Sequence, residues 1–298
     1  MKILVFGATG SQQFHVIREA KSKGAIVYAV SSSEKNFAKL EESGAIPVLG
    51  DMSNAERMKE ITKKIDAIAL LIPASLANPA DGFQFAKNVI DAAKENGVKL
   101  IVWNTSGYLA PVRIGIPMED VKLDVRDYFK QSGVPFVIIE PPIYAENLLA
   151  PYTTDYVKKE RKVAYPTPED MPIGWIASRD VSAFVVEALY KPELSGQSIM
   201  ISGLDNLKGN QLAEKFSIAM NEKIAFYALP PKECGDILSN FMEESAARGV
   251  QAYYEMLASQ SVYPSRFNSK MKEVLEKLPV KMTPIEEWIK MHKDFFIG

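Results

Sequence analysis

The sequence predicts an α/β fold, a doubly wound parallel sheet with a smaller C-terminal α+β domain. Three observations lead to this class. Short, continuous apolar runs recur along the first half of the chain, helical patterns separate them, and the first run ends in a glycine-rich turn. Continuous apolar runs are typical of parallel strands, because helices cover both faces of such strands. Ligands of these sheets bind beyond the carboxyl ends of the strands, so the turns at those ends are the candidate site.

The first apolar run, Ile3–Phe6, predicts a buried strand that ends at Gly7. A helical pattern begins near Phe14, and Gly24 follows it as the expected C′ residue. Between them, glycine lets the backbone approach a pyrophosphate, and the helix N-terminus offers free N–H groups and a positive dipole end. A tight turn without a ligand is the alternative. We expect a dinucleotide to contact the turn residues Gly7, Thr9, Gly10, Ser11, Gln12 and Gln13.

The segment after the second strand, Ile26–Val30, selects the cofactor. An NAD-specific site usually places an acidic residue here to bind the ribose 2′-hydroxyl. This chain has Ser31 and Ser32, followed by Lys35. Hydroxyls and a lysine suit a 2′-phosphate better than a carboxylate would, which favours NADP(H) over NAD(H). The alternative is that Lys35 and Lys39 form one solvated helix face.

The third strand, Ala45–Leu49, leads to two further cofactor-binding candidates, Asp51 and Met52. Asp51 lies just past the carboxyl end of this strand, on the side where a ligand binds. The alternative is that Asp51 serves only as a turn residue. We expect Ser53 to cap the helix that follows, with Glu56 completing a capping box.

The remaining strands of the sheet are predicted by three apolar runs, Ala67–Ile72, Leu100–Trp103 and Phe136–Ile139. Helices near Ala80–Glu95 and Glu119–Gln131 connect them. The turn that leaves the fourth strand, Ile72–Ser75, adds Ile72 and Pro73 to the cofactor-binding candidates.

The second half of the chain is less regular, and we expect a domain boundary near residue 150. Residues 1–150 form the dinucleotide-binding domain and residues 151–298 a smaller substrate domain, the two interleaved around residues 175–202. Proline-rich loops are expected around Pro151–Pro172, and Asp180 is the expected N-cap of a helix from Val181. Further strands are predicted at Ile173–Ile176, Gln197–Ser202 and Ile224–Leu229, and helices at Lys208–Met220, Pro231–Ala247, Ala252–Ser259 and Pro284–Phe295, the last with Thr283 as N-cap.

The composition limits the classes of function. The 298 residues are 47% hydrophobic and 24% charged, which is enough apolar material for a large core. A net charge of −2 with both signs interspersed argues against nucleic-acid partners, and no apolar run is long enough for a membrane span. Two histidines are too few for a histidine-based metal site. One cysteine and a strand that begins directly after Met1 indicate a cytoplasmic protein without a signal peptide.

Five segments in consistent order share a pattern with one known family: Gly7–Gly10, Gly50-Asp51, Ser132–Phe136, Pro142–Asn147 and Trp175–Val181. On these segments, over about residues 1–230, the chain resembles the NmrA-like atypical short-chain dehydrogenase/reductases. The resemblance implies an NAD(P)-binding Rossmann domain and a C-terminal domain that closes over a substrate cleft. It also adds Tyr144 and Asn147 to the cofactor-binding candidates, although Tyr144 can equally be a packed aromatic.

The resemblance also suggests catalytic residues. Short-chain reductases pair a tyrosine with a lysine four residues later, and the lysine lowers the tyrosine pKa and binds the nicotinamide ribose. Lys122 occupies the lysine position, but the tyrosine position holds Met118, which cannot donate a proton. Lys122 would bind the ribose or polarise a substrate oxygen; a solvated helix lysine is the alternative. The other catalytic candidates are the hydroxyls of Thr105 and Ser106 near the nicotinamide and Tyr108 as a substitute proton donor.

Three residues depart from the family pattern. Gln13 replaces the third glycine of the turn, where its side chain either points along the helix or obstructs the pyrophosphate. Ser31 or Ser32 replaces an arginine after the second strand, and Glu140 replaces an arginine before Pro141.

Two functions are consistent with these residues. The first is a cytoplasmic NAD(P)H-dependent reductase that transfers hydride to a small carbonyl or quinone-type substrate. The second is a nucleotide-sensing regulator without turnover that acts through a protein partner. Neither involves a nucleic acid, a membrane or a metal.

Overall fold

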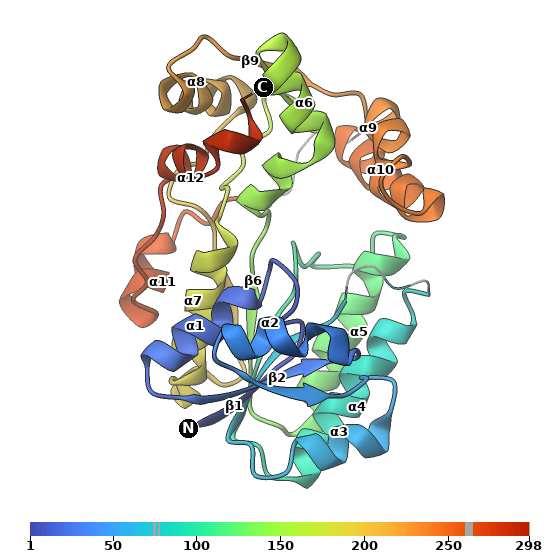
Figure 1. Ribbon diagram of the computed structural model, residues 1–298. Coiled ribbons are helices and arrows are strands. Elements are labelled where there is room, and N and C mark those ends of the chain that lie inside the picture. The colour runs from blue at the N-terminus through green and yellow to red at the C-terminus, as the bar shows by residue number, and fades with distance from the viewer. Residues whose placement is uncertain (74–75, 77, 260–264, 298) are drawn as a thin grey trace. The chain divides into compact units, whose positions relative to one another are not determined.

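The computed structural model describes residues 1–73, 76, 78–259 and 265–297 (Figure 1). The chain divides into two compact units, each assembled from separate segments. The first unit comprises Met1–Pro141, Ser178–Ile201 and Lys270–Lys281. The second comprises Pro142–Ala177, Ser202–Ser269 and Met282–Gly298.

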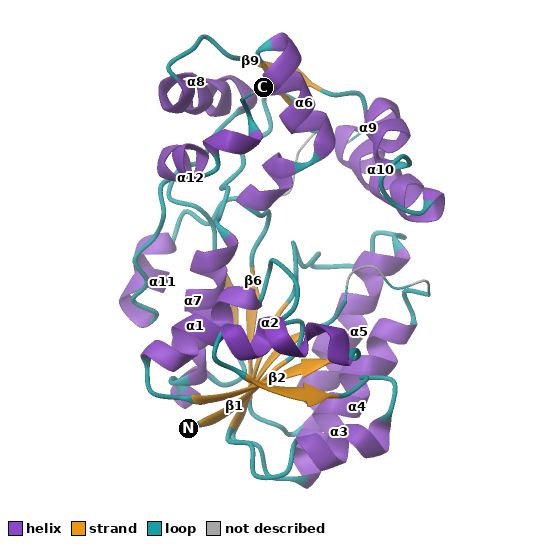
Figure 2. Cartoon of the chain, viewed as in Figure 1, coloured by secondary structure: helices purple, strands orange, loops and turns teal. Residues whose placement is uncertain are grey.

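A seven-stranded sheet forms the centre of the first unit (Figure 2). Its order is β3-β2-β1-β4-β5-β6-β8, and every neighbouring pair is parallel. The chain runs outward from β1 to β3, then returns to β4 and continues in the other direction, so the order reverses between β1 and β4. This topology confirms the predicted fold class. The strands are β1 (Lys2–Val5), β2 (Ile26–Ser31), β3 (Ile46–Leu49), β4 (Ala67–Leu71), β5 (Leu100–Asn104), β6 (Phe136–Glu140) and β8 (Ser198–Met200).

Helices cover both faces of this sheet. Successive residues of a strand point to opposite faces, so each strand contributes side chains to the helix layer on either side. On one face, Leu4, Ile68 and Ile101 pack in a single core with residues of α3, α4 and α5. On the other face, α1 lies against α7, which packs on β4 and β5. The helical segments of the unit are α1 (Phe14–Ser22), η1 (Glu34–Asn36), α2 (Phe37–Glu42), α3 (Ala55–Ile61), α4 (Asp81–Glu95), α5 (Pro117–Ser132), α7 (Ser178–Leu189), η3 (Pro192–Leu194) and α11 (Met271–Lys277).

The second unit has its own aromatic core around a two-stranded parallel sheet. The strands are β7 (Lys162–Tyr165) and β9 (Ala225–Ala228). Tyr165 is fully buried and meets the rings of Trp175 and Tyr254 edge to face. The helical segments are η2 (Ala145–Leu149), α6 (Pro151–Glu160), α8 (Gly209–Met220), α9 (Pro231–Leu238), α10 (Glu244–Ala258), α12 (Ile285–Met291) and η4 (Lys293–Phe295).

The expected proline-rich loop after residue 150 is wrong. Pro151 begins helix α6, and the chain then forms β7. A proline at the first helical position is favourable because its missing N–H has no partner there and its φ suits the helix. The expected strand at Ile173–Ile176 is reduced to isolated bridges, from Ile173 to Leu207 and Arg266 and from Ile176 to Tyr144.

The expected helix Pro231–Ala247 is also wrong, since two helices occupy this stretch. Ser239 and Asn240 donate side-chain hydrogen bonds to the carbonyl of Asp236, which ends α9 at Leu238. Polar side chains of this kind satisfy the last carbonyls of a helix and so terminate it. A new helix, α10, begins at Glu244 and includes the stretch expected as a separate helix at Ala252–Ser259.

Three predicted helix starts are shifted. The N-cap of α3 is Asn54, whose side chain accepts from the Arg57 N–H, and not Ser53. Helix α7 begins at Ser178, which places Asp180 in its first turn. The terminal helix α12 has Pro284 at its N-cap position and ends at Met291, before the short 3₁₀ turn η4.

Within the described residues, no helix is both long and apolar enough to cross a membrane. In the same part of the chain, no three His, Cys, Asp or Glu side chains come together as a possible metal site.

The end of β6 gives a prediction about pH. Glu140 accepts a hydrogen bond from the Ser198 hydroxyl, and burial is the main cause that raises the pKa of Glu140 above its ordinary value. Because the folded chain then holds this proton more tightly than the unfolded chain, stability falls as pH rises above the unfolded pKa. We predict that Glu140→Gln raises Tm relative to the wild type more at about pH 7 than at about pH 4.

Thermal unfolding of both proteins at the two pH values checks this prediction. Glu60→Gln, at an exposed position of α3, is the control. The same change in Tm at both pH values would contradict a raised pKa of Glu140 in the folded chain.

Candidate functional site

Two glycines shape the turn between β1 and α1, and each meets a different structural requirement. Gly7 has φ +74°, and a Cβ at this position would lie 2.7 Å from Leu71 Cδ2. Gly10 donates its N–H to the Gly7 carbonyl at 3.1 Å and accepts from the Phe14 N–H, which begins α1. Gly10 and Ser11 are exposed, and Thr9 is half-buried. The turn therefore presents small residues and a helix N-terminus at the carboxyl edge of the sheet.

Gln13 takes neither of the two orientations expected for it. Its side chain is fully buried, and Nε2 donates to the Phe6 carbonyl at 3.0 Å. The side chain thus turns back beneath the turn toward the end of β1. Gln13 Oε1 is buried and has no hydrogen-bond partner among the described residues. The missing third glycine consequently leaves the outer surface of the turn clear.

The serines after β2 hold their own loop together. The Ser31 hydroxyl is buried, donates to the Ser33 carbonyl at 2.8 Å and accepts from Asn36 Nδ2 at 3.0 Å. Ser33 caps the short helix η1. The Ser31 hydrogen is therefore already used inside the protein, whereas Ser32 and Lys35 are exposed at the surface of the loop.

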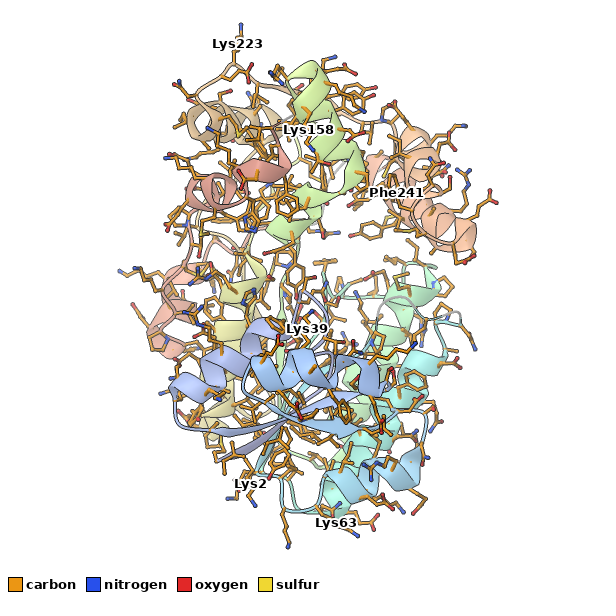
Figure 3. All side chains as sticks on the ribbon, viewed as in Figure 1. Lys2, Lys39, Lys63, Lys158, Lys223 and Phe241 are labelled. Atoms are coloured by element: carbon orange, nitrogen blue, oxygen red, sulfur yellow. The ribbon has the colours of Figure 1, made fainter. Side chains whose placement is uncertain are left out.

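Lys39 is the lysine that contacts the glycine turn. It projects from α2, and its Nζ lies 3.4 Å from the Thr9 carbonyl and 5.0 Å from the centre of the Phe14 ring (Figure 3). The sequence offers Lys39 beside Lys35 as a further partner for a 2′-phosphate, with one solvated face as the alternative. Its i,i+4 spacing from Lys35 could not reveal that the side chain leans back over the turn.

The residues after β3 and β4 contribute less. Asp51 is exposed and accepts the Ser53 N–H at 2.8 Å, as a turn residue does. Met52 is 8% exposed, packs in the core and accepts from Asn88 Nδ2 through its carbonyl. Ile72 packs against the same core and Pro73 is exposed. The rest of the expected Ile72–Ser75 turn, Ala74 and Ser75, lies outside the described residues.

A compact polar loop follows β5. Asn104 Oδ1 accepts the Ser106 N–H at 3.0 Å, and Ser106 has φ +60°, which is uncommon for a residue other than glycine. Thr105 Oγ1 donates to the Gly107 carbonyl at 2.6 Å. Ser106 Oγ donates to Gln12 Oε1 at 2.6 Å, so the glycine turn and this loop are joined. Strained backbone of this kind concentrates at functional sites.

The hydrogen bonds of this loop determine which hydroxyls can still donate a hydrogen bond to a ligand. A hydroxyl carries one hydrogen, and the hydroxyl hydrogens of Thr105 and Ser106 are given to protein acceptors. In this arrangement both hydroxyls can accept a hydrogen bond from a ligand but cannot donate one.

Lys122 is a hydrogen-bond donor that lies beside this loop. Its Nζ lies 2.9 Å from Glu119 Oε2 and at a longer 3.5 Å from the Tyr108 carbonyl. Its side chain is only 15% exposed, which contradicts the alternative of a solvated helix lysine. An ammonium carries three N–H groups. Two can serve these acceptors, and the third is left for a ligand. Glu119 is not among the site residues predicted from the sequence, although the Glu-x-x-Lys spacing places Glu119 and Lys122 on one helix face.

Tyr144 and Asn147 belong to the second unit. Tyr144 is 2% exposed and bridges to Ile176, so it is a packed aromatic. Asn147 lies in η2 and makes a side-chain hydrogen bond with Tyr165, which acts to lower the pKa of that tyrosine while burial raises it more. Their part in cofactor binding stays a prediction.

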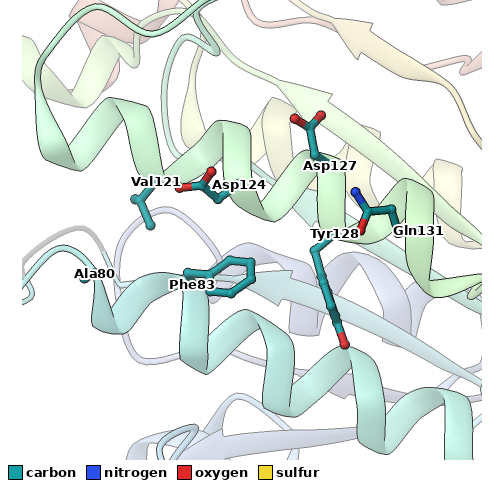
Figure 4. Close-up of a pocket in the computed structure, with 7 residues that line it drawn as sticks. All are labelled: Ala80, Phe83, Val121, Asp124, Asp127, Tyr128 and Gln131. Carbon is teal, nitrogen blue, oxygen red and sulfur yellow. The ribbon is translucent and has the colours of Figure 1, made fainter.

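A surface pocket of about 520 Å³ lies between α4 and α5 (Figure 4). Phe83 and Tyr128 meet edge to face on its wall, with ring centres 5.7 Å apart. None of the site residues predicted from the sequence lines this pocket. Its lining residues on α5 share one helix face, while Glu119 and Lys122 belong to another. The lining residues are Ala80, Phe83, Val121, Asp124, Asp127, Tyr128 and Gln131.

Comparison with known proteins gives one family. The model of the NmrA-like family matches residues 1–289. The NAD(P)H azoreductase of Xenophilus azovorans is 24% identical over 258 residues, which is 85% of this chain and 86% of that protein. The photosystem II assembly factor Ycf39 of Guillardia theta is 27% identical over 234 residues, 73% of this chain and 70% of its own.

Solved structures agree on the fold. The NADPH-dependent quinone oxidoreductase QOR2 of Escherichia coli, complexed with NADPH, superposes with a TM-score of 0.80. The superposition covers 98% of this chain and 99% of that one, at 16% sequence identity. The Rossmann-type architecture is thus shared, although the sequences have diverged widely.

The glycine turn gives a second prediction. We predict that Gly7→Ala lowers the free energy of unfolding by about 1–3 kcal/mol, because the new Cβ meets Leu71 and the residue must keep a positive φ. Gly10→Ala is the matched control, since its Cβ would find its nearest atom, the Gly7 carbonyl oxygen, at 3.6 Å. Urea unfolding of both variants measures the difference. Equal stability of the two would contradict this description of the turn.

Proposed function

The chain belongs to the NmrA-like family, and from this premise we propose that it is an NAD(P)H-dependent reductase that transfers hydride to a small carbonyl or quinone-type substrate. One observation carries the proposal. The partly buried ammonium of Lys122 lies beside the polar loop that follows β5. That loop is at the edge of the sheet where ligands of doubly wound folds bind.

The residues of the first unit fit NADP(H). The outer surface of the turn consists of Gly10 and Ser11, which are exposed, and Gln13 does not intrude there. The first N–H groups of α1 and these two residues would hold the pyrophosphate. Lys39 beside the turn, with Lys35 after β2, would bind a 2′-phosphate. The bound cofactor supplies a hydride from its nicotinamide ring.

The chain's own residues would orient the substrate and stabilise its reduced oxygen. Lys122 would donate a hydrogen bond to the oxygen that gains negative charge, and this effect is strong in a site shielded from water. The oxygen atoms of Thr105 and Ser106 would accept hydrogen bonds from the ligand. Ser106 would be held in place by Gln12 and Asn104, which bond to its hydroxyl and its N–H.

The relatives support this class of reaction. One relative is named an NAD(P)H azoreductase, and one structural neighbour is named an NADPH-dependent quinone oxidoreductase. The same kinds of acceptor are the first to screen with this chain, with azo compounds added to quinones and aldehydes.

A regulator without turnover is the second candidate. It is favoured by Met118 in the tyrosine position and by the hydroxyls of Thr105 and Ser106, which are already bonded within the protein. The assembly factor Ycf39 among the relatives is consistent with a protein partner.

A titration with NADPH, NADP⁺, NADH and NAD⁺ tests the cofactor. We predict micromolar binding of NADPH and weaker binding of NADH. Lys39→Ala is expected to weaken NADPH binding about tenfold and to leave NADH unchanged, because only NADPH carries the 2′-phosphate that the lysine would pair with. Lys59→Ala on α3, paired with Glu56 and Glu95, is the control.

The same samples separate the two candidates. Oxidation of bound NADPH by a quinone, aldehyde or azo compound supports the reductase. Binding without oxidation by any of these acceptors, together with a protein partner whose capture depends on NADPH, supports the regulator. No binding of any of the four nucleotides contradicts both.

A further inference from the structure

The ion pair between Glu119 and Lys122 has a role beyond linking adjacent turns of α5. We propose that Glu119 is a positioning residue that holds the Lys122 ammonium against the loop after β5. This inference rests on the proposed function, since it assigns the group that makes Lys122 effective there.

The contacts of Lys122 leave its ammonium in one place. Lys122 Nζ is 2.9 Å from Glu119 Oε2 and 3.5 Å from the Tyr108 carbonyl oxygen. A Cβ placed on Gly107 would be 3.5 Å from the same nitrogen, so the backbone of the loop is within contact distance. A lysine side chain is long and flexible. Among the described residues, the Tyr108 carbonyl at 3.5 Å is then the remaining hydrogen-bond acceptor that defines its position.

The burial of this pair distinguishes it from the other ion pairs within helices. The Lys122 and Glu119 side chains are 15% and 13% exposed. In Lys59–Glu56, which has the same i,i+3 spacing, they are 37% and 81% exposed. In Lys290–Glu286 they are 54% and 28% exposed. Exposed pairs are ordinary features of helix surfaces and contribute little.

Stability alone does not account for a pair that is shielded from water. Removing two charges from water costs free energy that their attraction often fails to offset, so apolar residues would serve a helix surface at least as well. Lys122 also lies beside Gly107 and the Tyr108 carbonyl, which directly follow the strained Ser106 in the chain. Polar groups arranged in this way are typical of a site that is organised before the ligand binds.

These contacts give Glu119 and Lys122 different roles. Glu119 fixes where the ammonium lies and uses one of its N–H groups. Lys122 directs a remaining N–H toward a nicotinamide ribose or a substrate oxygen. Glu119 itself touches neither, so its loss should act entirely through Lys122.

Four variants test this inference: Glu119→Ala, Glu119→Gln, Lys122→Ala and the double variant Glu119→Ala/Lys122→Ala. The NADPH Kd, and kcat and KM with a quinone acceptor, are measured for each. Glu119→Ala is expected to approach Lys122→Ala, with kcat lowered about tenfold or more, and Glu119→Gln to recover part of the loss because it keeps an acceptor oxygen. The double variant should be no worse than Lys122→Ala, because the two residues act as one unit.

A second measurement needs no cofactor. The rate at which an amine-acylating reagent modifies Lys122, mapped by mass spectrometry, should rise at least about threefold in Glu119→Ala, because the released side chain reaches solvent. Glu56→Ala, which removes one of the two carboxylates paired with Lys59, is the control and should leave the Lys122 rate unchanged.

The outcomes separate the inference from the proposed function. A wild type that neither binds nor oxidises NADPH overturns the proposed function, and the acylation rate still decides whether Glu119 holds Lys122. A wild type that turns over, with Glu119→Ala unchanged in both kinetics and acylation, overturns the inference alone. Additive losses in the double variant would likewise overturn it.

Discussion

The constraint on which the structure depends is the common direction of all seven strands in the first unit. Because they are parallel, every loop at their carboxyl ends meets at one edge of the sheet. Residues far apart in sequence are thereby brought together, as the hydrogen bond between Ser106 and Gln12 shows across 94 positions. The glycine turn, the loop after β5 and the start of α5 become neighbours only through this topology.

Polar contacts then adapt this edge to a sequence that departs from its family. Gln13 satisfies the Phe6 carbonyl from below the turn, so the loss of a glycine changes the interior of the turn more than its surface. Lys39 reaches the turn from α2 and supplies a positive charge where an arginine after β2 is missing. Lys122 keeps its place through Glu119 although Met118 cannot donate a proton. The first two of these contacts join different elements, whereas Glu119 and Lys122 share helix α5 with Met118.

The sequence predicts the sheet well because apolar runs and glycines are local signals. The strands from β1 to β6 and the turn at Gly7 follow from them directly. The helix that begins at Pro151 and the end of α9 before Ser239 and Asn240 are not predicted, since a proline can begin a helix and a side chain can end one without any change in hydrophobic pattern. The direction of Gln13 and the burial of Lys122 depend on packing between distant segments. Glu119 is not among the predicted site residues, although its spacing from Lys122 places both on one helix face.

The measurement that tests this account most directly is a crystal structure of the protein with NADPH. We expect the pyrophosphate on the turn between β1 and α1, the 2′-phosphate beside Lys39, and the nicotinamide ribose within hydrogen-bond reach of Lys122 Nζ, with Gln13 still bonded to Phe6. A cofactor bound elsewhere, or one that reaches the turn only after Gln13 leaves the Phe6 carbonyl, would contradict it.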